Sequence, residues 1–217
     1  MAPDLYYMPA SPPCRAVMLT AEAIGIPLNL KYIDIFSGEH HKPEFIELNP
    51  QKTIPLLVDA EYRLTESRAI MCYLVDKYGK NARLYPKNPD IRALINQRLH
   101  FDIGTLYNNL AAYYYPVIFK KQAEYDQDQY EKLKDAFEVL EKFLEGQDYA
   151  VGRNLTIADL ALAASVSTAV ALGFDLGGYK NVDRWMEKVK SSAPGYRTAN
   201  GEGVELLKKM VADMRNE

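Results

Sequence analysis

The chain of 217 residues lacks the features of several specialised protein classes. No run of about 18 apolar residues occurs, so a membrane-spanning helix is not expected. The first residues contain no basic segment followed by an apolar run, which argues against a secretory signal. Two cysteines, Cys14 and Cys72, are too few for a disulfide framework or a four-cysteine zinc site. A reducing, cytoplasmic setting is therefore expected.

Charge and composition exclude further classes. The 26 Lys and Arg residues are balanced by 29 Asp and Glu residues, and they form no basic block, so nucleic-acid binding lacks its usual electrostatic basis. Only three histidines occur, and His100 falls in a different part of the chain from the other two, so no metal site is expected. Hydrophobic residues at 48% and charged residues at 25% are typical of a globular protein with one large domain or two small ones.

The first eighty residues alternate between strand and helix signals. Pro12 and Pro13 suit a first helical turn, and Gly25 suits a helix end. Ser67 is expected to cap the last helix of this part. The order predicts a mixed sheet with helices packed on it. The expected elements are strands at 4–8, 28–35, 54–58 and 62–64, and helices at 12–24, from 43 to 49–50, and from 67 to 79.

The second part carries no strand signal. Residues 156–172 are apolar almost all round, which predicts a buried central helix, and Thr156 with Asp159 forms a capping-box motif at its start. We therefore expect an α/β domain at 1–80, a linker at 81–89 and an all-helical domain at 90–217, with a ligand site in the cleft between them. Apolar residues recur at helical spacing at Ile91, Leu94, Ile95, Leu99, Ile103, Leu106, Leu110, Tyr130, Leu133, Phe137, Leu140, Leu144, Val182, Trp185, Met186, Val189, Val204, Leu207, Met210 and Val211.

Ser11 stands between the first strand and the first helix. A helix N-terminus favours an anion, and a thiol placed there ionises more easily. Ser11 and Cys14 have the spacing of a Cys-x-x-Cys pair in which a hydroxyl replaces the first thiol. A hydroxyl without an activating base is a poor nucleophile, so Ser11 is better suited to donate a hydrogen bond. The simpler alternative is a loop serine or a helix cap. Cys14 is expected to be a small buried apolar residue, and Cys72 even more so.

A second polar group follows the predicted hairpin. Glu66, Ser67 and Arg68 either cap a helix with solvated neighbours, or bind the carboxylate and ammonium of an amino-acid group. His40, His41 and Lys52 are candidate partners for a second carboxylate, although isolated surface side chains of this kind often have no such role.

Aromatic residues gather on the helix that follows residue 106. They either pack the helical core or line an apolar pocket that tolerates varied ligands. The residues concerned are Tyr107, Leu110, Tyr113, Tyr114, Tyr115 and Phe119.

Taken together, these residues resemble a cytosolic glutathione S-transferase, and most closely the insect delta class. The resemblance covers nearly the whole chain, and the order and spacing of its motifs make it specific. The motifs are Ser11-Pro12-Pro13-Cys14-Arg15, Gly38-Glu39-His40, Asn49-Pro50-Gln51-Lys52-Thr53-Ile54-Pro55, Leu64-Thr65-Glu66-Ser67-Arg68-Ala69-Ile70 and Leu155-Thr156-Ile157-Ala158-Asp159.

The resemblance implies a thioredoxin-like N-terminal domain with a mixed sheet that binds glutathione, followed by an all-helical C-terminal domain that supplies the hydrophobic substrate pocket. It implies that Ser11 hydrogen-bonds the glutathione sulfur and that Pro55 follows a cis peptide bond. The implied glutathione-binding residues are Ser11, His40, Lys52, Thr53, Ile54, Pro55, Glu66, Ser67 and Arg68, and the implied pocket residues are Tyr107, Leu110, Tyr115 and Phe119. Lys52 stands where delta-class members commonly carry histidine, and Leu110 stands where an aromatic residue is often found.

The expected activity is conjugation of the glutathione thiolate to hydrophobic electrophiles, as in detoxification. Glutathione is the co-substrate, no other cofactor is expected, and the resemblance implies a homodimer. One alternative is a glutathione-dependent peroxidase or thiol reductase, which would need an exposed Cys14 of low pKa. Another is a non-catalytic ligand-binding protein on the same scaffold, in which a thiol-activating hydroxyl would have no purpose.

Overall fold

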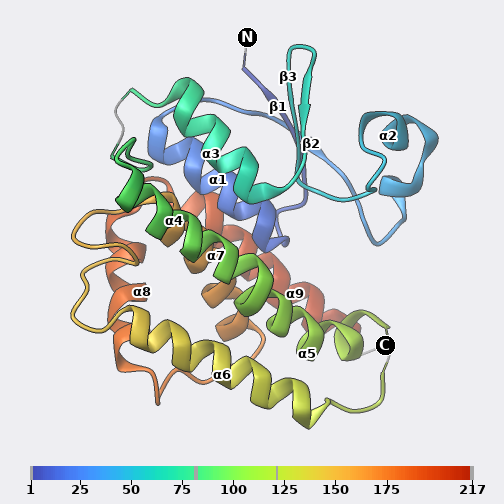
Figure 1. The fold of residues 1–217 in the computed structure, drawn as a ribbon. Helices are drawn as coiled ribbons and strands as arrows, with labels where there is room; N and C mark the ends of the chain where they lie inside the picture. Colours follow the sequence, from blue (N-terminus) through green and yellow to red (C-terminus); the bar gives the residue numbers. More distant parts are fainter. Residues whose placement is uncertain (1, 81–82, 121, 216–217) are drawn as a thin grey trace.

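The computed structural model describes residues 2–80, 83–120 and 122–215, and its regular structure falls into two parts (Figure 1). All strands of the described residues lie between Asp4 and Leu64, and the described residues from Pro89 onward form helices as their only regular structure. The predicted fold class, a thioredoxin-like N-terminal domain followed by an all-helical domain, is confirmed. The boundaries at 80 and 90 stay a prediction, and residues 81–82 of the expected linker lie outside the described residues.

The N-terminal part is built around a four-stranded sheet in the order β2-β1-β3-β4. β1 pairs in parallel with β2 and antiparallel with β3, and Leu5 stands opposite both Leu30 and Leu57. This is the mixed sheet that the sequence predicts. The elements are β1 (Asp4–Tyr7), α1 (Pro12–Ile24), β2 (Asn29–Tyr32), the 3-10 turn η1 (Glu39–His41), α2 (Pro43–Leu48), β3 (Leu56–Asp59), β4 (Tyr62–Leu64) and α3 (Ser67–Tyr78).

Helix α1 connects the two parts. It contacts α3 in its own domain and α7 in the helical domain, and most of its residues are buried. Pro12 and Pro13 occupy its first turn as predicted, and Gly25 ends it in a left-handed conformation with φ of 71°. A residue without Cβ adopts that conformation at little cost. The buried side chains of α1 therefore face the helical domain directly behind the turn that holds Ser11.

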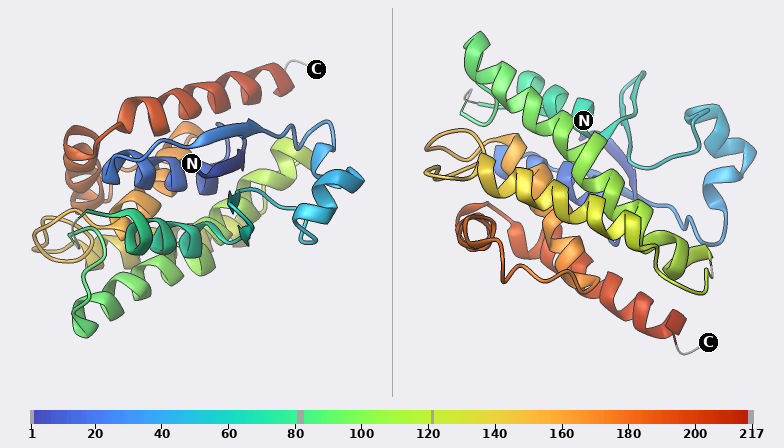
Figure 2. Two further views of the ribbon diagram at one scale, coloured as in Figure 1. Left: turned by 90° about the horizontal axis from the view of Figure 1, so that it is seen from above. Right: turned by 60° about the horizontal axis from the view of Figure 1, so that its bottom comes forward.

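The helical part is a bundle in which three helices, α4, α5 and α9, begin or end at a π turn (Figure 2). One π turn, η2 (Asp102–Leu106), joins α4 to α5, and the other, η3 (Arg197–Gly201), precedes α9, which runs along one side of the bundle toward the C-terminus. Such turns carry one residue more than an α-helical turn and are frequent at functional sites. The helices are α4 (Pro89–Phe101), α5 (Tyr107–Lys120), α6 (Gln127–Phe143), α7 (Ile157–Ala171), α8 (Lys180–Ser192) and α9 (Glu202–Arg215).

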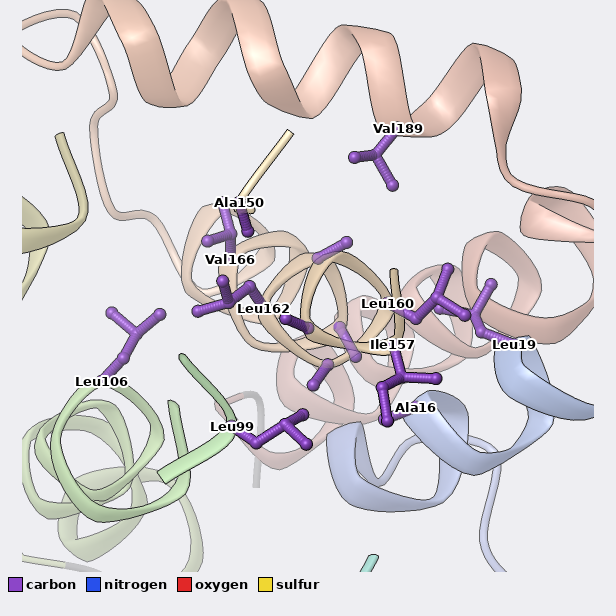
Figure 3. Close-up of a cluster of buried hydrophobic side chains, with 14 of the residues drawn as sticks. Ala16, Leu19, Leu99, Leu106, Ala150, Ile157, Leu160, Leu162, Val166 and Val189 are labelled. Atoms are coloured by element: carbon purple, nitrogen blue, oxygen red, sulfur yellow. The ribbon is translucent and has the colours of Figure 1, made fainter. Parts of the chain in front are cut away.

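Helix α7 lies at the centre of the helical part. Figure 3 shows it nearly end-on, with Leu99, Leu106 and Val189 from neighbouring helices around it and Ala16 and Leu19 reaching it from α1. Every residue at 157–169 is buried, as the sequence predicts. None of the helices in the described ranges combines the length and apolar character needed to cross a membrane.

The predicted capping box at the start of α7 is confirmed and is larger than expected. The backbone N–H and hydroxyl of Thr156 donate to one oxygen of Asp159 at 2.8 and 2.9 Å. The other oxygen accepts from the N–H of Ala150 at 2.6 Å and from the indole of Trp185 at 2.8 Å. Burial raises the pKa of Asp159, although these donors oppose the shift. The carboxylate thus joins three segments of the helical domain.

Not every apolar residue of the predicted α4 repeat is in the core. Ile95 and Leu99 are buried against α7, whereas Ile91 and Leu94 are 41% and 47% exposed. Helix α4 has only one face against α7, so the remaining apolar side chains stay at the surface.

Candidate active site

A cavity of about 290 Å³ opens between the two parts of the molecule. Its walls come from the β1–α1 turn with the start of α1, the segment from Ile35 through η1, helix α5 and helix α9. Because these segments lie far apart in the sequence, the fold alone assembles the cavity. The lining residues are Met8, Ala10, Ser11, Pro12, Ile35, Phe36, His40, Tyr107, Tyr115, Phe119, Lys120 and Leu207.

Ser11 precedes α1 in an extended conformation and lines the cavity. Its N–H donates to the Met8 carbonyl at 3.0 Å, and its own carbonyl accepts from the N–H of Arg15 at 3.0 Å. Ser11 is the N-cap residue of α1, as the simpler alternative predicts, but its hydroxyl makes no hydrogen bond to an N–H of the helix. Pro12 and Pro13 have no N–H, which leaves the hydroxyl as the main donor that this helix start offers to an anion.

Cys14 is fully buried one turn into α1. Burial raises the pKa of its thiol to about 11, and a hydrogen bond with the Ser11 hydroxyl only partly offsets this. The thiol is therefore protonated at neutral pH and out of contact with solvent, as predicted for a small core residue. Cys72 is partly buried and packs against the core, so the prediction of a small buried apolar residue holds for it only in part. It lies on the outer side of α3, beside a groove next to α4.

His40 lies on η1 and lines the cavity, whereas His41 does not. The two rings are 4.0 Å apart. Burial and the neighbouring His41 lower the pKa of His40, so its ring is neutral at pH 7. The buried Nδ1 of His40 has no hydrogen-bond partner among the described residues. A neutral ring with an unused nitrogen is able to contact a polar ligand.

The loop before β3 carries the next group of predicted residues. The predicted cis peptide bond between Ile54 and Pro55 is confirmed. Asn49 fixes the loop by donating to the Thr53 carbonyl at 2.8 Å. Lys52 is exposed and has a left-handed φ of 56°. Since Tyr6 pairs with Leu56 in antiparallel register, the residues just before Leu56 run beside the end of β1, next to the turn that holds Ser11.

Glu66, Ser67 and Arg68 open α3, but not in the predicted way. The cap position belongs to Glu66, with a φ of 63°, and Ser67 is the first helical residue. A left-handed φ is uncommon outside glycine and recurs at ligand clamps. The Ser67 hydroxyl accepts a hydrogen bond from Arg68 at 2.7 Å. Arg68 is buried and ion-paired with Asp102 in η2, so it points toward the helical domain rather than into the cavity.

The loop that carries Lys52 and the start of α3 meet at one end of the sheet. The Gln51 amide, on the loop that carries Lys52 and Thr53, lies 3.5 Å from the Glu66 carboxylate. Neither that loop nor the start of α3 contributes to the cavity wall. The structure therefore divides the predicted residues into a cavity group around Ser11 and His40 and a neighbouring edge group on the loop and the start of α3.

Three of the four predicted pocket residues line the cavity. Tyr107 and Tyr115 have ring centroids 6.3 Å apart, and Tyr115 and Phe119 have centroids 5.1 Å apart. Burial raises the pKa of both tyrosines, so they are neutral. Leu110 is fully buried in the core and does not line the cavity, which corrects its assignment. At 3.6 residues per turn it faces away from the side that the three aromatic residues share.

Sequence analysis missed several lining residues. Phe36, on the loop after β2, packs on Phe119 with centroids 5.1 Å apart. Leu207 fits the apolar repeat of α9, and nothing in that repeat separates a cavity-lining side chain from a core side chain. Lys120 ends α5 and places a cation at the edge of the cavity. These three residues line the cavity only because distant segments pack together, and the sequence around each of them does not indicate this.

Comparisons with known proteins agree with this fold. The glutathione S-transferase N-terminal domain model matches residues 5–82, and the C-terminal domain model matches residues 106–193. A delta-class glutathione transferase of Nilaparvata lugens is 51% identical, with a TM-score of 0.94 over 98% of this chain and 99% of that one. A glutathione transferase of Bombyx mori is 42% identical, with a TM-score of 0.93 over 97% and 98%. A homologue from Drosophila mojavensis with bound glutathione is 35% identical, with a TM-score of 0.91 over 98% and 97%.

Proposed function

Since this chain belongs to the glutathione S-transferase family, we propose that it conjugates the glutathione thiolate to hydrophobic electrophiles, with the Ser11 hydroxyl stabilising the thiolate. The observation that carries this proposal is the Ser11 hydroxyl. It lies in the cavity wall, makes no hydrogen bond to an N–H of the helix, and is followed directly by two prolines that offer no N–H to an anion. Detoxification in the cytoplasm is the proposed role.

Glutathione is proposed to lie across the two groups of polar residues. The γ-glutamyl end would meet Glu66 and Ser67, with Arg68 behind them. The cysteinyl part would meet the backbone of Ile54, and the glycyl carboxylate would lie near His40 and Lys52. The contact between the loop before β3 and the start of α3 supports this placement, and so does the position of that loop beside the turn that holds Ser11. Lys52 and Glu66 also both have a left-handed φ, which recurs at ligand clamps. Thr53 would contribute through the same loop.

The Ser11 hydroxyl and the N-terminus of α1 together are able to supply the stabilisation that the thiolate requires. A thiol with the ordinary pKa of ~8.5 is about 3% ionised at pH 7, and lowering the pKa by ~2 units makes it about three-quarters ionised. That gain of roughly 25-fold requires about 2.7 kcal/mol. A hydrogen bond to a charged group contributes ~1.5–3 kcal/mol, and a helix dipole adds ~0.3–1 kcal/mol. Holding both reactants together supplies further rate acceleration.

The electrophile is proposed to occupy the apolar side of the cavity. Tyr107, Tyr115 and Phe119 form that side, and Phe36 extends it. A volume of about 290 Å³ suits a small aromatic or aliphatic electrophile. Because burial keeps both phenols neutral, this wall presents an apolar aromatic surface to the electrophile.

A homodimer is proposed as well, since the resemblance to the family implies one. Tyr62 on β4 and Ile91 and Leu94 on α4 are exposed large apolar side chains that association with a second copy would cover. A monomer in sedimentation velocity runs at micromolar concentration would contradict the proposal.

The role of Ser11 is tested by Ser11→Ala, with Ser191→Ala on the exposed face of α8 as the matched control. The thiolate absorbance of bound glutathione is titrated, and conjugation of a chloronitrobenzene is followed. We expect the S11A substitution to raise the pKa of the bound thiol by one to two units, roughly the loss of a charged hydrogen bond. Turnover should fall at least about tenfold, and glutathione affinity should fall much less. An unshifted pKa in S11A would remove Ser11 from this role.

The thiol reductase alternative is disfavoured by the buried, protonated Cys14. The non-catalytic alternative predicts binding of glutathione without conjugation, so the same assay on the wild-type protein distinguishes it.

A further inference from the structure

Arg15 is a fully buried cation directly behind the Ser11 turn. It lies in α1 four residues after Ser11, and its N–H donates to the Ser11 carbonyl. All five of its side-chain hydrogen bonds go to neutral acceptors, which are the carbonyls of Pro9 (3.4 Å), Ala10 (2.7 Å) and Ala164 (3.3 Å), the amide oxygen of Asn200 (2.9 Å) and the hydroxyl of Thr168.

No carboxylate of the described residues forms an ion pair with Arg15. Burial lowers the pKa of Arg15 to about 10, which leaves it charged at neutral pH. The titratable groups that face it are Cys14 on its own helix, Tyr107 and Tyr115 on α5, and Tyr196 before η3. All four are neutral at pH 7, because burial raises the pKa of each. The positive charge of Arg15 is therefore not cancelled locally.

The charge acts on the cavity from inside the protein. Arg15 lies behind four residues of the cavity wall. It donates hydrogen bonds to the carbonyls of Ala10 and Ser11, and it faces the phenols of Tyr107 and Tyr115. Helix α9 closes the opposite side, because a Cβ on Gly203 would overlap the Pro9 carbonyl and the Arg15 side chain. Water is thereby kept from the guanidinium, and a charge in such surroundings is screened less than a surface charge.

We propose that Arg15 is a positioning residue for the reaction, which holds the turn before Ser11 through its carbonyls and supplies the positive potential that stabilises the glutathione thiolate in the cavity. The inference rests on the proposed function, since the thiolate is the anion that this charge favours. An uncompensated buried cation is costly by itself, and a bound anion nearby offsets that cost.

The test changes the charge without removing the arginine. Asn200→Asp keeps the size and the acceptor oxygen of residue 200 and places a carboxylate against the guanidinium. Thr168→Val is the matched control, because it removes another acceptor of Arg15 without changing the charge. In the glutathione complex, we expect the N200D substitution to raise the pKa of the bound thiol by about one unit, which means about tenfold less thiolate below that pKa. The T168V substitution should leave the pKa within about 0.3 units of wild type.

Equal shifts in the two variants, or an unchanged thiol pKa in N200D, would overturn the role of Arg15. Where N200D fails to fold, Arg15→Lys and Arg15→Met replace it. The lysine keeps the charge with fewer donors and should preserve most of the lowered pKa, whereas the methionine should not, and equal values would again overturn the inference. A wild-type complex whose thiol pKa is not lowered at all would instead refute the proposed function.

Discussion

Two arginines from the N-terminal domain reach into the helical domain, where one binds a charged side chain and the other a neutral one. Arg68 on α3 binds the carboxylate of Asp102 in the π turn η2. Arg15 on α1 binds the neutral amide of Asn200 in the π turn η3. Both arginines are buried, and their partners Asp102 and Asn200 are fully buried.

In both places a buried arginine binds a residue of a π turn, but the electrostatic result differs. At Arg68 the positive charge is neutralised where the domains meet, so the pair acts mainly on stability. At Arg15 the positive charge is left over, so its effect extends to the cavity. Holding two domains together does not require a counter-charge, provided that enough carbonyl and amide oxygens surround the cation.

The largest effect is expected at the neutralised pair. Asp102→Asn leaves Arg68 buried without a carboxylate and should lower the free energy of unfolding by about 3–5 kcal/mol. Urea unfolding measures the change. The control is Asp76→Asn, which breaks the more exposed pair with Arg92 and should cost about 1 kcal/mol or less. If both substitutions cost the same, Arg68 is not held by charge neutralisation.

Asp159 is the anionic counterpart of Arg15 in this comparison. Like Arg15 it is fully buried, and its partners are neutral donors. Asp159→Asn turns an amide group toward N–H donors that need an acceptor, so we expect a loss of about 2–3 kcal/mol. Thermal unfolding, with the exposed Asp213→Asn as control, measures it, and conjugation by the folded protein should be unchanged. A melting temperature equal to that of the control would show that the donors find other acceptors.

The smallest effect belongs to a cluster near the surface. Burial by itself would raise the pKa of Asp59, but hydrogen bonds from Lys77, Tyr78 and Tyr73 outweigh it and lower the pKa to about 2. The lowered pKa stabilises the fold above the ordinary carboxyl pKa of ~4, and this contribution is lost as the pH falls from there toward 2. Asp59→Asn should therefore flatten the decline of the melting temperature over this interval. An unchanged decline would assign it to other carboxylates.

Much of the fold was predictable because its signals are local. Pro12, Pro13 and Gly25 mark both ends of α1, and Thr156 with Asp159 marks the start of α7. Each of these signals depends on residues a few positions apart, which makes them readable without the tertiary structure.

The site was predictable only in part. Ser11 and His40 could be named from their motifs, and the structure places both in the cavity wall. The partner of Arg15 could not be predicted, because Asn200 lies 185 positions away in the sequence. Ser67 was misassigned as a cap because the left-handed backbone of Glu66 leaves no mark on residue type. Long-range contacts and backbone conformation thus account for what sequence analysis missed.

The π turn between α4 and α5 also constrains how the chain can change in length. Each residue of a helix rotates the following side chains by about 100°, so the extra residue in Asp102–Leu106 sets the angular offset between Asp102 and the aromatic side of α5. Removing one residue there would rotate Tyr107, Tyr115 and Phe119 out of the cavity while leaving α4 in place. Evolutionary drift or chimera building can therefore exchange amino acids in this stretch far more freely than it can insert or delete them.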